Sequence, residues 1–87
     1  MADKPVVGKF YKVVHSRKGT FYGKVVSVGG NVDDPDMFMD VEVTSGVANA
    51  IMNYNVGYPG DVIGIRNSHT LLYEVTEEVA RGTQEGK

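Results

Sequence analysis

Hydrophobic residues along the chain occur in short runs in which apolar and polar positions tend to alternate, and Gly, Pro, Asn, Asp and Ser separate the runs. A period of two is typical of strands with one buried face, whereas an amphipathic helix has a period near 3.6. We therefore predict an all-β fold of three successive hairpins, with about five to six antiparallel strands. An open sheet cannot bury its own apolar face, so we expect a small barrel or a bent two-sheet sandwich.

The clearest predicted hairpin covers residues 37–56, where Ser45 and Gly46 separate two alternating segments. A two-residue loop at this point fixes the register of the two strands. The pairs that would share one buried face are Met37 with Tyr54, Met39 with Met52, Val41 with Ala50, and Val43 with Ala48. The alternative is a helix through Val47, Ile51 and Tyr54, which leaves the intervening Asn residues unexplained.

Two further hairpins are predicted on either side. The first joins strands at 9–15 and 20–28 through a four-residue loop, which places Tyr11 opposite Lys24. Gly23, in the middle of the second strand, indicates a bulge or a close approach of another backbone. The last hairpin turns at residues 67–69, after a turn at 57–60.

The predicted last hairpin puts four apolar residues on a core face. Ile65 would pair with Leu71, and Ile63 with Tyr73. Between the first two hairpins, residues 29–36 form a loop, because Pro35 and two adjacent Gly residues exclude regular structure.

Length and composition indicate one small domain, with residues 1–76 as the β-barrel and 77–87 as a flexible C-terminal tail with few apolar anchors. The chain has no run of about 18 apolar residues and does not begin like a signal peptide, so we expect a cytoplasmic protein that does not enter a membrane. Because it has no Cys, neither disulfides nor thiolate metal sites are expected.

Charge is unevenly distributed. Six of the nine basic residues lie within residues 1–24, together with one of the eleven acidic residues. Aromatic residues lie between these cations, a mixture that binds nucleic acid because cations neutralise phosphates and rings stack on bases. The candidate nucleic-acid-binding residues are Lys9, Tyr11, Lys12, Arg17, Lys18, Tyr22 and Lys24. Alternatively, Phe10 and Phe21 belong to the core and the lysines protect an edge strand from aggregation.

A second candidate surface is acidic, and consists of Asp33, Asp34, Asp36, Asp40 and Glu42. Acidic side chains in a loop can dock onto a basic protein, and a free strand edge can add to a partner's sheet. The alternative function is therefore a protein-interaction module: an inhibitor, an adaptor or a structural homo-oligomer. A viral accessory protein would suit this size.

Enzymatic motifs are missing. Residues 19–24 resemble a phosphate loop but are one residue short, and Val25 stands where Ser or Thr would bind magnesium. His15 and His69 each lie beside a predicted turn, where we expect solvated side chains; with no Cys, a zinc site would need carboxylates as well. The acidic loop lacks the ligand register of a calcium-binding loop. We expect a binding module with no metal, no cofactor and no catalytic residues.

The segments Phe10–Val14 and Gly19–Val28 together resemble the start of an SH3-like barrel of the KOW or Tudor kind, which opens with a strand, a basic turn and a glycine-marked second strand. This resemblance makes an SH3-like barrel the expected form of the all-β fold. It assigns no functional residue.

Overall fold

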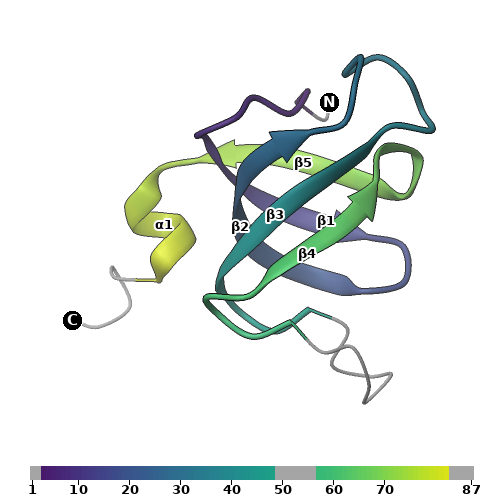
Figure 1. The fold of residues 1–87 in the computed structure, drawn as a ribbon. Coiled ribbons are helices and arrows are strands. Elements are labelled where there is room, and N and C mark those ends of the chain that lie inside the picture. Colours follow the sequence, from purple (N-terminus) through teal and green to yellow (C-terminus); the bar gives the residue numbers. More distant parts are fainter. Residues whose placement is uncertain (1–2, 49–56, 83–87) are drawn as a thin grey trace.

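Five antiparallel strands form one curled sheet in a computed structural model of the chain, which describes residues 3–48 and 57–82 (Figure 1). Their order is β4-β3-β2-β1-β5. The elements are β1 (Phe10–His15), β2 (Gly19–Val28), β3 (Phe38–Ser45), β4 (Val62–Arg66), the 3-10 turn η1 (Asn67–His69), β5 (Thr70–Val75) and the helix α1 (Glu77–Arg81). The all-β prediction is confirmed.

The strands at the two ends of the sheet are β4 and β5. Among the described residues, no ladder joins β4 to β5, although η1 connects them along the chain. Closure of the sheet is thus not shown, and the SH3-like barrel stays a prediction. No helix in this part of the chain is long and apolar enough to cross a bilayer.

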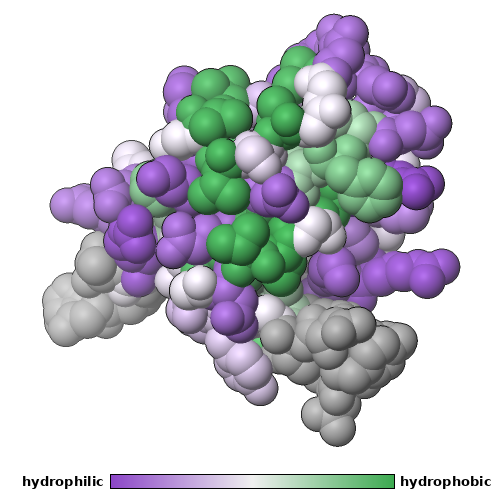
Figure 2. Space-filling view, in the orientation of Figure 1, coloured by the Kyte–Doolittle hydropathy of each residue, from purple (hydrophilic) through white to green (hydrophobic). Residues whose placement is uncertain are grey.

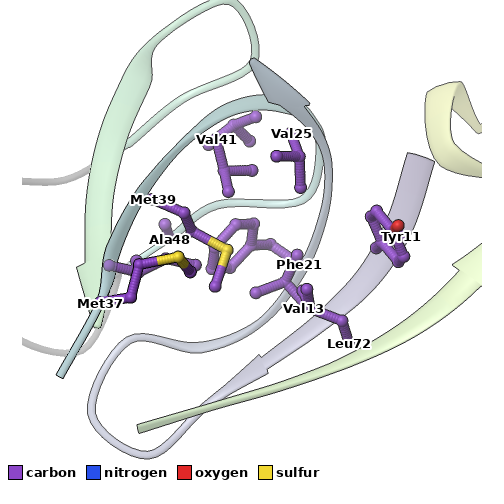
Figure 3. Packing of buried hydrophobic residues seen from close by; sticks show 11 residues of the cluster. Tyr11, Val13, Phe21, Val25, Met37, Met39, Val41, Ala48 and Leu72 are labelled. Carbon is purple, nitrogen blue, oxygen red and sulfur yellow. The ribbon is translucent and has the colours of Figure 1, made fainter. Parts of the chain in front are cut away.

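The core lies on the concave side of the curled sheet, where alternate residues of the strands meet (Figure 3). Burial of these apolar side chains provides the main driving force for folding, at about 25 cal/mol per Å² of surface. The buried set is Tyr11, Val13, Phe21, Val25, Met37, Met39, Val41, Val43, Ala48, Ile65 and Leu72.

The first hairpin exists, but its predicted register is wrong by one residue. The loop is one residue shorter than expected, because Gly19 adopts a positive φ of 79° and pairs with His15. Tyr11 therefore lies opposite Gly23 rather than Lys24. Since side chains alternate across a strand, the slip separates the two residues: Lys24 lies on the solvent side of the sheet, and Tyr11 lies in the core.

The predicted central hairpin is wrong, although its first strand is found as β3. Both hydrogen-bonding edges of β3 are occupied, by β2 on one side and β4 on the other. Val41, for example, lies between Val25 and Ile63, so Ala50 cannot be its partner. Ala48 forms a bridge with Gly57 instead of Val43. The rest of the predicted second strand and the alternative helix fall largely on residues 49–56, outside the described residues.

The two strands of the predicted last hairpin exist as β4 and β5, but they do not pair with each other. β4 pairs with β3, and β5 pairs with β1, with Val13 opposite Leu72. The inward residue of β5 is therefore Leu72, which is buried, and not Leu71 or Tyr73. The turn η1 carries the chain from one end of the strand order to the other.

Helix α1 replaces the first part of the predicted flexible tail. The Thr76 hydroxyl caps the helix by accepting a hydrogen bond from the Val79 amide, and Gly82 ends it in the left-handed conformation. Ala80 is fully buried, and its carbonyl accepts a 2.6 Å hydrogen bond from the Thr44 hydroxyl. The domain therefore extends beyond residue 76, and residues 83–87 lie outside the described residues.

Candidate nucleic-acid interface

The convex side of β5, β1 and β2 carries three rows of side chains. Directly paired residues of antiparallel strands lie on the same face, so the register defines each row. We call these nine residues the outer face: Leu71, Val14 and Thr20 in the first row, Tyr73, Lys12 and Tyr22 in the second, and Val75, Phe10 and Lys24 in the third. Three of the nine are aromatic, two are lysines and none carries a carboxylate.

The outer part of β5 is unexpectedly apolar for a solvent-facing surface. Leu71 is 48% exposed and Tyr73 is 37% exposed, whereas Leu72 between them is 2% exposed. A strand with one solvated face normally presents polar residues there. Exposed apolar and aromatic residues gathered on one face are typical of a binding surface.

Phe10 lies within reach of two cations that come from different elements. The Lys24 ammonium is 5.9 Å from the centre of the Phe10 ring, and the Arg81 guanidinium of α1 is 5.3 Å from it. Arg81 is oriented by a 2.8 Å hydrogen bond from its Nε to Glu77. The helix therefore adds Arg81, as part of an ion pair with Glu77, at the edge of the outer face.

The β1–β2 turn is held by a buried histidine. His15 is 7% exposed, and its Nδ1 accepts hydrogen bonds of 3.1 Å from the backbone amides of Arg17 and Lys18. Burial, together with the positive charges of Lys18, His69 and Arg17, lowers the pKa of His15 and so favours the neutral form that this acceptor role needs. The expected solvated side chain is thus wrong for His15.

The predicted basic residues are divided between different parts of the surface. Lys12 and Lys24 lie together on the outer face, and Arg17 and Lys18 lie in the turn beyond its first row. Lys9 does not belong to this face, and its ammonium forms a 3.3 Å ion pair with Glu74.

The two predicted tyrosines have different environments. Tyr22 is half-buried on the outer face, in the same row as Lys12. Tyr11 is 1% exposed; its hydroxyl donates to the Lys4 carbonyl and accepts from the Val6 amide. Burial raises the pKa of Tyr11. Tyr11 is a core residue, and its ring cannot stack on a base.

Sequence reasoning missed three residues of this surface. Leu71 and Tyr73 were assigned to the core because the predicted hairpin loop at residues 67–69 paired them with Ile65 and Ile63. Arg81 was placed in the tail. A signal for Arg81 was present, since Thr76 followed by two glutamates marks the start of a helix.

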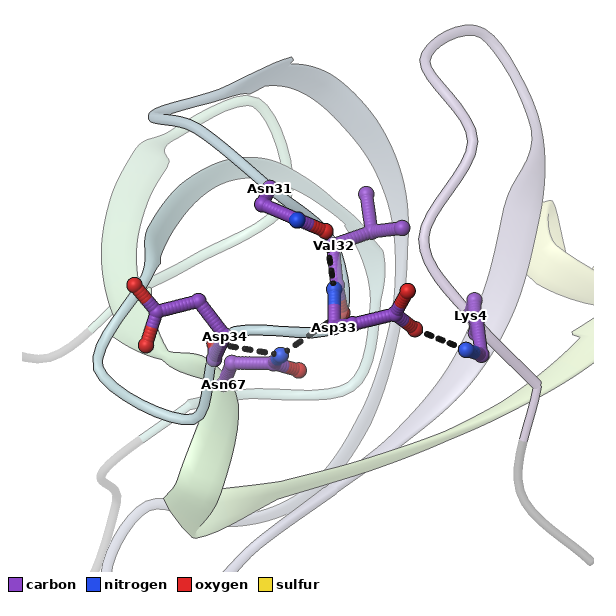
Figure 4. Close-up of polar contacts among 6 residues, drawn as sticks. All are labelled: Lys4, Asn31, Val32, Asp33, Asp34 and Asn67. Carbon is purple, nitrogen blue, oxygen red and sulfur yellow. Dashed lines mark hydrogen bonds and ion pairs between the residues drawn. The ribbon is translucent and has the colours of Figure 1, made fainter.

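The predicted acidic surface is divided as well. Asp33, Asp34 and Asp36 lie in the loop between β2 and β3, whereas Asp40 and Glu42 lie on the outward side of β3. Two of the loop carboxylates are used within the fold. Asp33 forms an ion pair with Lys4 (Figure 4). Asp34 accepts a hydrogen bond from the Asp36 amide. The loop is further held by Asn67, whose side-chain amide donates to the carbonyls of Val32 and Asp34.

The outward side of β3 and β4 continues the outer face beyond β2, where Glu42 lies opposite Lys24, and it mixes charges. Phe38 is exposed and the Arg66 guanidinium lies 4.9 Å from the centre of its ring, while Asp40 accepts a 2.7 Å hydrogen bond from Ser27. Figure 2, in the orientation of Figure 1, shows hydrophobic residues near the middle of the visible face, with hydrophilic residues between and around them. Carboxylates on this side disfavour phosphate binding.

Within the described part of the chain, no group of three or more His, Asp or Glu side chains is placed to hold a metal ion. Comparisons with protein families, with curated proteins and with solved structures find no match to this chain. Any functional assignment must therefore come from the geometry itself.

Proposed function

We propose that this protein binds single-stranded nucleic acid on the outer face of β5, β1 and β2. The observation that carries the proposal is the composition of that face, which combines three aromatic rings and two lysines with no carboxylate. Lysines neutralise phosphates with release of counterions, and exposed rings stack on unpaired bases.

The middle row gives the proposal its most specific form. Lys12 lies between Tyr22 and Tyr73 on neighbouring strands, so a lysine and two tyrosines share one row of the same face. A strand crossing this row would place a phosphate at Lys12 and bases on the two rings. Paired bases in a duplex hide their faces, so this arrangement favours single strands.

The first test measures the affinity for a fluorescein-labelled ten-residue oligothymidylate by anisotropy across a range of salt concentrations. Lys12→Ala and Lys24→Ala should each weaken binding and lower the slope of log K against log salt by about 0.7, since one phosphate contact is lost. An unlabelled duplex of the same length should compete poorly.

Lys9→Ala is the matched control, because it removes the same charge from outside the outer face. It should leave the salt slope close to that of the unmodified protein. Failure of the unmodified protein to bind the oligonucleotide at low salt would exclude the proposal. So would an equal loss of affinity in Lys9→Ala and Lys12→Ala.

A further inference from the structure

A hollow of about 290 Å³ adjoins the outer face at the row formed by Leu71, Val14 and Thr20. It is lined by Val14, Ser16, Ser68, His69, Thr70 and Leu71. Val14 and Leu71 belong to both the hollow and the outer face, so the two surfaces are continuous. The β1–β2 turn, which carries Arg17 and Lys18, lies beside it.

The walls of the hollow are joined by hydrogen bonds. The Ser16 amide donates to the His69 carbonyl at 2.9 Å, which joins the β1–β2 turn to η1. The ring of His69 meets the ring of His15 edge to face, with 6.0 Å between their centres. The Thr70 hydroxyl donates to the Arg66 carbonyl at 2.8 Å. A site held in this way is preorganised, so little ordering is needed when a ligand binds.

The lining matches a planar ring with a polar edge. Val14 and Leu71 supply apolar surface, His69 supplies an aromatic ring, and Ser16 and Ser68 supply hydrogen-bonding groups. The volume is near the lower end of ligand sites, which span about 300 to 1,000 Å³, so a single ring system is the appropriate size. Nucleobases have apolar faces and polar edges, and the two cations of the adjacent turn suit the phosphate attached to one.

We propose that the hollow holds one unpaired base of the bound strand, with an adjoining phosphate near Arg17 and Lys18. This assignment rests on the proposed function, because it places the end of the same strand that crosses the outer face. His69 would contact the base directly. Leu71, which belongs to both surfaces, would contact the strand where it passes from the outer face into the hollow.

The test compares an eight-residue oligothymidylate with the same backbone lacking every base. His69→Ala should weaken binding of the oligothymidylate about fivefold or more, the effect of losing one stacked base, and leave binding of the abasic backbone unchanged. His69→Phe keeps a ring and should restore most of the affinity. Tyr58→Ala is the matched control, since it removes an exposed ring from a turn outside the hollow.

Amide chemical shifts provide a second measurement that needs no variant. The octamer should shift the amides of Ser16, His69 and Leu71, and an octamer that shifts only residues of the second and third rows overturns the proposal. A titration with thymidine monophosphate distinguishes a site for a free nucleotide from a site for a base within a strand. If the shifts of these amides saturate at micromolar thymidine monophosphate, the hollow is a mononucleotide site and the assignment to a strand is overturned.

The two proposals fail in different ways. If Lys12→Ala and Lys24→Ala weaken binding but His69→Ala does not, the hollow is not a base site and the outer face still binds nucleic acid. If the unmodified protein binds no oligonucleotide at low salt, both proposals are wrong.

Discussion

Gly23 lies where the backbones of β2 and β3 approach each other closely, beside an irregularity in their pairing. A Cβ added at this position would be 2.4 Å from a methyl group of Val41 and 2.9 Å from the carbonyl oxygen of Glu42. The sequence predicted either a bulge or a close backbone approach at Gly23, and the structure shows the close approach next to a register shift. The residue is glycine because no side chain fits.

Gly23→Ala should therefore destabilise the protein. The backbone oxygen cannot move without disturbing the β2–β3 ladder, and overpacking of this kind costs about 1–3 kcal/mol in the free energy of unfolding. Urea unfolding monitored by circular dichroism measures the change. Gly30→Ala is the control, because nothing lies within 4 Å of its added Cβ, and its effect should stay within about 0.5 kcal/mol. Equal stability of the two variants would show that the close approach is absent.

His15 makes stability depend on pH. Its pKa is lowered in the folded protein, so below pH 6.5 the unfolded chain binds a proton that the folded protein does not take up readily. The contribution of neutral His15 to the free energy of unfolding is therefore complete above pH 6.5. This contribution decreases as the pH falls below that value. Protonation of Nδ1 would also remove the acceptor for the amides of Arg17 and Lys18.

Denaturant midpoints measured between about pH 7.5 and 5.5 test this dependence. His15→Asn keeps a hydrogen-bond acceptor near the position of Nδ1 but does not titrate, so its stability should change less over the same range. His69→Asn keeps His15 and should retain the decrease. An identical pH profile for His15→Asn and the unmodified protein would contradict the assignment.

At the scale of elements, α1 stabilises the domain although it follows the last strand. It buries Ala80, receives a hydrogen bond from Thr44 of β3 and places Arg81 beside Phe10 of β1. Removal of residues 77–87 should lower the free energy of unfolding by roughly 1–3 kcal/mol, because these contacts and the capping hydrogen bond of Thr76 are lost.

A protein that stops after Gly82 is the matched control for this truncation. It keeps the helix and its left-handed cap, so its thermal midpoint should remain close to that of the full chain. If the chain ending at Thr76 is as stable as the chain ending at Gly82, α1 does not contribute to the fold.

Local patterns predicted the strands better than their partners. Runs of β-branched and aromatic residues between turn residues identified the five strands of the described residues, because such runs are a property of each strand alone. Pairing depends on which edges are free, and β3 uses both edges for strands that are distant in sequence. The Ser45-Gly46 signal indicated a turn correctly, and Gly46 has a positive φ of 79°, but the chain after it does not return to β3.

At the scale of the whole molecule, sequence reasoning found part of the candidate site. It selected Lys12, Tyr22 and Lys24, which lie close together because their strands are adjacent in the chain. It missed Tyr73, because the pairing of β5 with β1 joins residues about sixty positions apart. It included Tyr11 wrongly, because a one-residue change in loop length decides which tyrosine faces the core.

The pairing of β1 with β5 also determines when the sheet can be completed. During synthesis, β1 and β2 emerge early, but the second edge of β1 has no partner until residues 70–75 have been made. Contacts between such distant residues slow folding, and an unpaired strand edge can associate with another chain. The nascent protein thus carries an open β1 edge until residues 70–75 have been made, and pairing with β5 then covers that edge.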